Sequence, residues 1–161
     1  MARNNLSQGL ASHLTGMSER QAIATLNQEG RRLKHIAVKL WRKHLSTYQP
    51  KAYVRTRNTQ RGIKLGRVKR ISPTEYGIEL TFENDLMYHD SIFGSGQPQG
   101  HSLMLISDGW HSKKLESKIG RVYMLTYFEG TGYLSEVYRQ YNAGAPMGVR
   151  LDVQWSGAYT K

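Results

Sequence analysis

A long apolar repeat between Ser18 and Leu45 constrains the fold more than any other feature of the sequence. Apolar residues recur there at steps of three and four, which is the spacing of one side of an α-helix. Ser18 and Gln21 can form a capping box at its start, and Pro50 cannot continue it. We therefore expect a long amphipathic helix that buries one side against another element. The repeat comprises Ile23, Leu26, Leu33, Ile36, Ala37, Leu40, Trp41 and Leu45.

A strand pattern follows the helix. Apolar residues at positions 76, 78, 80 and 82 alternate with Gly77, Glu79, Thr81 and Glu83. Strict alternation is typical of a strand with one buried face. A basic strand over Ile63–Ile71 and a turn at Pro73 precede it, so the two strands are predicted to form a hairpin.

Three segments nearer the C-terminal end have weaker patterns. Helical spacing predicts a second, short helix over about Gly132–Asn142, and alternation predicts a last strand over Val149–Trp155. Arg121–Phe128 has extended character, whereas Leu103–Ile106 is an apolar run that does not distinguish helix from strand. The predicted fold class is α+β: a long N-terminal amphipathic helix packed on a small, mostly antiparallel sheet, with a short helix and a C-terminal strand.

The domain organisation is simple. A chain of 161 residues has the length of one domain, and no linker divides it. Residues 1–17 are polar and contain Gly9 and Gly16, so we expect a flexible arm that is ordered only against a partner. Residues 18–161 are expected to form the single α+β domain. Residues 50–62 are interpreted as a polar connector.

Charge is divided unequally along the chain. Through Arg70 there are sixteen Lys and Arg against two acids, whereas the remainder has seven bases against ten acids. Such asymmetry implies an anionic partner or an oppositely charged neighbouring subunit. A solvated helix face is the plain alternative. The basic residues predicted to contact a nucleic acid or protein partner are Arg31, Arg32, Lys34, Lys39, Arg42, Lys43, Arg55, Arg57 and Arg61.

Catalytic chemistry is not indicated. The chain has no cysteine, which excludes disulfides and thiolate metal ligands. His89, Asp90, His101, Asp108 and His111 fall in one loop-rich region, but their spacing matches no metal motif. The glycine-containing loop at residues 94–100 lacks the Lys-Ser/Thr ending of a phosphate-binding loop. We therefore predict no catalytic residue, no metal and no cofactor. An enzyme that uses the His/Asp set is a third, less favoured hypothesis.

Nucleic-acid binding is compatible with the charge. Clustered Lys and Arg suffice for binding to phosphates without sequence preference. Neither a zinc finger nor a helix-turn-helix pattern, which would indicate sequence reading, is present. No apolar run approaches the roughly 20 residues that span a bilayer, and no secretory signal is evident. We expect a protein made in a cytoplasm that has no membrane partner.

The order of the segments resembles a family of small virion proteins of tailed bacteriophages. A long helix is followed by Tyr53-Val54-Arg55-Thr56-Arg57-Asn58-Thr59 and then by a hairpin. Leu105-Ile106-Ser107-Asp108-Gly109-Trp110 comes next, and a helix around Tyr133–Tyr141 and a closing strand end the layout. This layout, over about residues 18–157, is similar to the tail-component or tail-completion proteins found at the head–tail junction.

The resemblance implies a function as well as a fold. It implies a non-enzymatic structural protein, located in the virion after assembly in the host cytoplasm. The expected partners are further copies in a cyclic ring, as a hexamer or dodecamer, and neighbouring neck or tail proteins. The basic surface would face the passing DNA or an acidic neighbouring ring. The alternative is a stand-alone, non-specific nucleic-acid-binding protein.

Overall fold

The long helix predicted from Ser18 onward is the largest element in the computed structural model of the chain. Helix α1 spans Glu19–Ser46. The Ser18 Oγ accepts a hydrogen bond from the Gln21 N–H at 3.4 Å, and the Gln21 side chain accepts one from the Ser18 N–H at 3.0 Å. The predicted capping box and the predicted end before Pro50 are confirmed. The structure describes residues 6–13, 17–47, 58–89, 100–111, 127–146 and 149–154.

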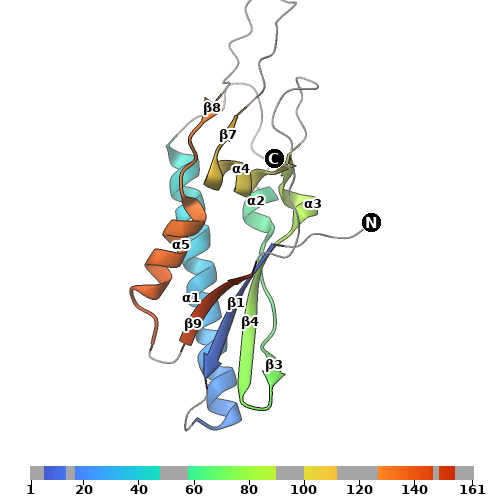
Figure 1. Ribbon diagram of the computed structural model, residues 1–161, viewed down its shortest axis with the longest axis vertical. Helices are drawn as coiled ribbons and strands as arrows, with labels where there is room; N and C mark the ends of the chain where they lie inside the picture. The colour runs from blue at the N-terminus through green and yellow to red at the C-terminus, as the bar shows by residue number, and fades with distance from the viewer. Residues whose placement is uncertain are drawn as a thin grey trace, which may run out of the picture.

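An antiparallel sheet of five strands covers one side of α1, and Figure 1 shows the helix running behind it. The strand order is β2-β4-β1-β9, and β3 pairs with the same strand β4 as β2 does. The strands are β1 (Leu6–His13), β2 (Ile63–Leu65), β3 (Lys69–Ser72), β4 (Glu75–Phe82) and β9 (Val149–Gln154).

Strand β4 supplies the sheet's part of the core. Its side chains at Tyr76, Ile78, Leu80 and Phe82 are buried, whereas Glu79 between them is exposed. This confirms the alternation predicted from the sequence. Full burial of one such side chain contributes about 1.5–3 kcal/mol to the free energy of unfolding. These four side chains of β4 are therefore a main attachment of the sheet to α1. The buried residues of α1 in the same core are Leu26, Leu33, Ala37 and Trp41.

The basic strand predicted over Ile63–Ile71 is divided into two. β2 pairs with the C-terminal half of β4, and β3 pairs with its N-terminal half. Gly66 lies between them and its N–H donates to the Glu79 carbonyl at 2.8 Å. The predicted antiparallel pairing is therefore correct, but it is made by two short strands along one edge of β4.

The prediction of a flexible arm over residues 1–17 is wrong for Leu6–His13. These residues form β1, which pairs with β4 on one side and with β9 on the other. Leu10, for example, lies opposite Ile78 in β4 and opposite Leu151 in β9. Pairing on both edges satisfies the backbone of a segment whose small and polar residues favour no local structure. Residues 1–5 and 14–16 lie outside the described residues.

A second helix packs beside α1 on the same side of the sheet. Helix α5 spans Tyr133–Asn142, which confirms the predicted short helix, and β9 confirms the predicted closing strand as far as Gln154. The Tyr133 hydroxyl donates to the Ala37 carbonyl at 2.7 Å. Its ring meets Trp41 edge-on, with 5.7 Å between centroids. The α+β class is therefore established.

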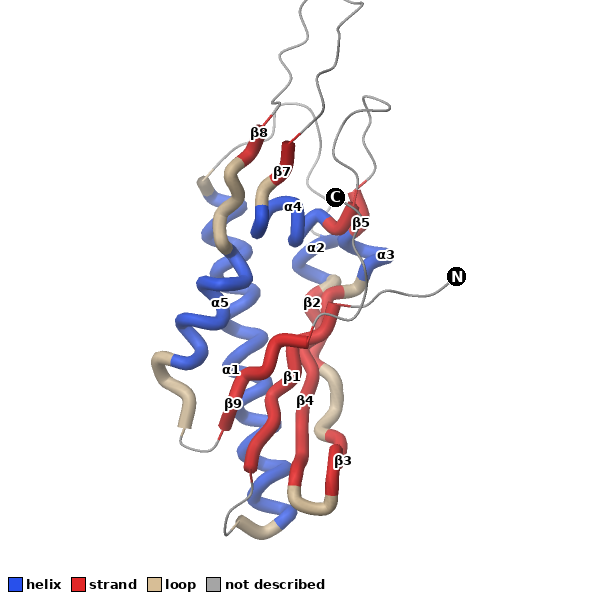
Figure 2. The backbone as a smooth tube through the Cα atoms, viewed as in Figure 1, coloured by secondary structure: helices blue, strands red, loops and turns tan. Residues whose placement is uncertain are grey.

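The remaining short elements gather at one end of the molecule, beyond the sheet (Figure 2). The undecided Leu103–Ile106 run is part of helix α4. Of the predicted extended segment 121–128, only its last two residues are described, as β8. The elements are α2 (Asn58–Arg61), α3 (Asn84–Met87), β5 (Tyr88–His89), β6 (Gly100–His101), α4 (Ser102–Asp108), β7 (Trp110–His111) and β8 (Tyr127–Phe128).

Candidate interaction surface on helix α1

Three arginines lie along one line of the outer side of α1. Arg20, Arg31 and Arg42 are spaced by eleven residues, which is just over three helical turns, so each lies almost directly above the previous one. Neighbouring arginines are about 16 Å apart along the axis, and the three span about 33 Å. All three side chains are exposed, because the opposite side of α1 is the one that packs on the sheet.

Lys39 lies between Arg31 and Arg42 along the helix, to one side of this line, and is also exposed. We refer to Arg20, Arg31, Lys39 and Arg42 as the basic row. Arg20 was not among the residues predicted to bind a partner. The eleven-residue spacing that it shares with Arg31 and Arg42 is visible in the sequence and could have identified it.

The positive charge of the basic row is not neutralised within the described part of the chain. Arg20, Arg31 and Lys39 form no ion pair or hydrogen bond there, and Arg42 makes only a 3.3 Å hydrogen bond from Nε to the Gln60 side chain. Some cations elsewhere in the described chain are paired. Lys64 and Lys69 on the sheet pair with Glu83 and Glu79 at 2.8 and 3.7 Å, and Arg139 pairs with Glu136.

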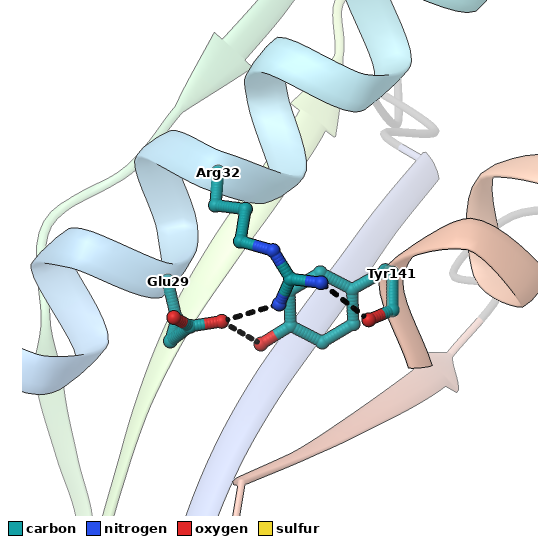
Figure 3. A network of polar contacts seen from close by, with 3 residues as sticks. All are labelled: Glu29, Arg32 and Tyr141. Atoms are coloured by element: carbon teal, nitrogen blue, oxygen red, sulfur yellow. Dashed lines mark hydrogen bonds and ion pairs between the residues drawn. The ribbon is translucent and has the colours of Figure 1, made fainter. Parts of the chain in front are cut away.

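The structure places Arg32 half-buried between α1 and α5 and not on the basic row (Figure 3). Its Nη1 lies 2.9 Å from the Glu29 Oε2, and its Nη2 donates to the Tyr141 carbonyl at 2.9 Å. The guanidinium also stacks over the Tyr141 ring, 4.8 Å from its centroid. The Tyr141 hydroxyl donates to the same Glu29 oxygen at 3.0 Å. We refer to Glu29, Arg32 and Tyr141 as the interhelix network, because it joins α1 to α5.

Burial of the interhelix network affects the pKa of its tyrosine. Burial is the largest cause that raises the pKa of Tyr141 above its ordinary value, and the hydrogen bond to Glu29 adds to it. A buried carboxylate is stable only when its charge is paired and its oxygens are hydrogen-bonded. Arg32 and Tyr141 supply both to Glu29, so Arg32 is assigned to holding α1 and α5 together.

The other predicted contact residues are dispersed. Lys34 is half-buried, whereas Lys43 is exposed and faces α5. There it contributes to the low pKa of Glu136, which is held at about 2 mainly by hydrogen bonds from Arg139 and Gln140. Arg61 is exposed at the end of α2, next to the Gln60 that contacts Arg42. Arg55 and Arg57 lie outside the described residues.

The structure places the backbone of four residues of the histidine and aspartate set. His89 and His101 lie in the paired strands β5 and β6, Asp108 ends α4, and His111 lies in β7. Asp90 lies outside the described residues. Among the side chains that the structure describes, no group of three or more His, Asp or Glu could hold a metal ion. No helix in the same ranges is long and apolar enough to cross a membrane.

Comparison with models of protein families, with curated proteins and with solved structures finds no match to this chain. The assignment of a function therefore depends on the basic row, on the interhelix network that sets Arg32 apart from it, and on the layout described from the sequence.

Proposed function

We propose that this chain is a non-enzymatic structural subunit of a tailed-phage virion. It assembles as a ring at the head–tail junction or tail, and the basic row of α1 contacts an anionic partner. The observation that carries the proposal is the row itself: four exposed cations, none of which has a counter-charge in the described chain. The order of helix, hairpin, short helix and closing strand supports the virion assignment through its resemblance to tail-completion proteins.

A ring would increase the affinity of the basic row for its partner, because the row would be repeated on every subunit. Identical subunits joined by heterologous contacts close into cyclic symmetry, so every feature of one subunit is repeated around the axis. Four cations on each subunit then form a continuous positive belt, whose field attracts an anionic partner more strongly than one subunit can. The rigid attachment of α1 to the sheet keeps the row in the same position on every subunit.

Mass photometry and negative-stain imaging of the purified protein test the proposal, alone and mixed with candidate neck and tail proteins of the same phage. Discrete rings or co-complexes are expected. Arg31→Gln with Arg42→Gln should weaken binding of the anionic partner and leave the subunit folded and able to form rings, because exposed substitutions change stability by about 0.5 kcal/mol or less. Lys64→Gln with Lys69→Gln is the matched control, since it removes the same charge from the sheet.

The result that contradicts the proposal is equally concrete. A protein that stays monomeric with every virion partner, and binds only nucleic acid, would fit the stand-alone nucleic-acid-binding protein instead. Equal loss of anionic-partner binding in the row variant and in the sheet variant would show that total charge, and not the basic row, is recognised.

A further inference from the structure

The basic row has the length and straightness of a polyelectrolyte contact. Its ends, Arg20 and Arg42, are about 33 Å apart along one helix, close to the roughly 34 Å of a single turn of duplex DNA. The helix between them is unbroken, and α1 is attached along its other side by buried residues such as Leu26 and Leu33. A partner with a regular row of negative charges can therefore meet several cations of the row together.

The row also lacks the residues that dominate contacts between proteins. Interface hot spots are mostly buried aromatic side chains and well-packed anchors. The exposed large hydrophobic residues among the described side chains are Met17, Ile71 and Tyr138, and none of them belongs to α1. The exposed positions that separate the cations are instead Ala24, Gln28 and His35. Binding to phosphates needs only the cations, because it is driven by release of counterions.

A second copy of the chain offers acids that are either paired or scattered over separate elements. Four of the described carboxylates, Glu29, Glu79, Glu83 and Glu136, already hold ion pairs within their own subunit. Glu75, Asp85 and Glu129 hold no ion pair among the described residues, but they lie in β4, in α3 and just before α5 and form no row. The negative charge that meets the row is therefore more readily supplied by a different molecule.

We infer that the basic row binds the phosphate backbone of duplex DNA without sequence preference, each subunit contacting about four phosphates. The inference rests on the proposed role of the row as a contact surface, and it names the partner. It does not depend on the ring, because a single subunit carries the whole row. Arg32 takes no part, since its guanidinium is engaged by Glu29 and Tyr141.

Fluorescence anisotropy with labelled duplexes of two unrelated sequences tests the inference over a range of salt concentrations. Four phosphate contacts predict a slope of log K against log salt of about −3.6, which is a loss of about 150-fold between 50 and 200 mM salt. The two sequences should bind alike. Arg31→Gln with Arg42→Gln should reduce the slope to about −1.8, which is a loss of about 12-fold over the same range.

Two arms of the experiment separate the inference from its rivals. Lys64→Gln with Lys69→Gln should keep the wild-type slope, and an equal reduction in this control overturns the inference. Unlabelled duplex should displace the probe at a lower charge concentration than polyglutamate. Displacement by polyglutamate at equal or lower charge concentration assigns the row to an acidic protein and overturns the DNA assignment. In that case imaging can still show rings and co-complexes, so the proposed function would survive.

Discussion

Arg31 and Arg32 are adjacent in the sequence, yet Arg31 is exposed whereas Arg32 contacts Glu29 and Tyr141. Replacement of each by methionine tests whether only Arg32 stabilises the fold. Arg32→Met removes the cation that pairs with Glu29, whose side chain is 10% exposed. Loss of one partner from a fully buried pair costs about 3–5 kcal/mol. Because the Arg32 side chain is itself 31% exposed and Tyr141 still donates to Glu29, we expect a cost of about 2 kcal/mol.

Urea denaturation followed by tryptophan fluorescence measures this cost, since Trp41 is buried in the core. The midpoint should fall while the m-value stays constant. A loss of 2 kcal/mol corresponds to a decrease of about 4–8 °C in Tm for a chain of this size. Arg31→Met should change the free energy of unfolding by about 0.5 kcal/mol or less, while it weakens DNA binding.

A second substitution separates the charge from the packing. If the unpaired Glu29 carboxylate causes the loss, Glu29→Gln combined with Arg32→Met should recover part of the stability, because a buried amide is less costly than a buried charge. The reasoning is refuted if Arg32→Met is as stable as Arg31→Met. It is also refuted if the double variant is less stable than Arg32→Met alone.

Two further predictions concern the α4–α5 region. Gly130→Ala should cost more than about 3 kcal/mol, because an added Cβ would lie 2.6 Å from the backbone nitrogen of Gly109. Gly132 also has a positive φ, but no atom lies within 4 Å of a Cβ added there. Calorimetry should therefore find that Gly132→Ala lowers the free energy of unfolding by only about 1–2 kcal/mol. Equal losses in the two variants would contradict the steric argument. Burial raises the pKa of Tyr133 above 10, the value of a tyrosine in the unfolded chain. The protonated phenol therefore contributes its full stability below pH 10. As the pH rises above 10, the free energy of unfolding decreases by up to about 1.4 kcal/mol per pH unit. Tyr133→Phe removes the hydrogen bond to Ala37 and should lower the free energy of unfolding by about 1 kcal/mol at pH 8. Between pH 10 and 11 the variant should lose less stability than the wild type. If urea denaturation shows the same dependence of the unfolding free energy on pH for both proteins, this reasoning is refuted.

The elements that the sequence predicted are those with local signals. Helix α1 has a capping box at Ser18 and a regular apolar repeat, and β4 has strict alternation that ends beside charged Glu83. Strand β1 has no such signal, because its partners Ile78 and Leu151 are distant in the sequence and its small residues fit several structures. The hairpin edge was predicted as one strand because its division at Gly66 depends on a bond to β4.

The candidate surface follows the same division between local and distant information. The spacing of Arg31, Lys39 and Arg42 within one helix determines that they share its outer side, so their common exposed position could be predicted from the sequence. The place of Arg32 depends on Tyr141, which is 109 residues away, and on the position of α5 against α1. Helical periodicity alone therefore could not separate Arg32 from Arg31.

The central position of β1 has a consequence for how the protein folds. It leaves the ribosome before every other described element, but β9, one of its two partners, follows all the other described elements in the chain. Helix α1 and the β3–β4 hairpin can form early from neighbouring residues, and β1 can pair with β4 once β4 has been made. The second edge of β1 needs β9, and that contact closes a much longer loop. Folding of the sheet should therefore end with β9 at its edge, and β1 should expose an open strand edge until β9 has been made.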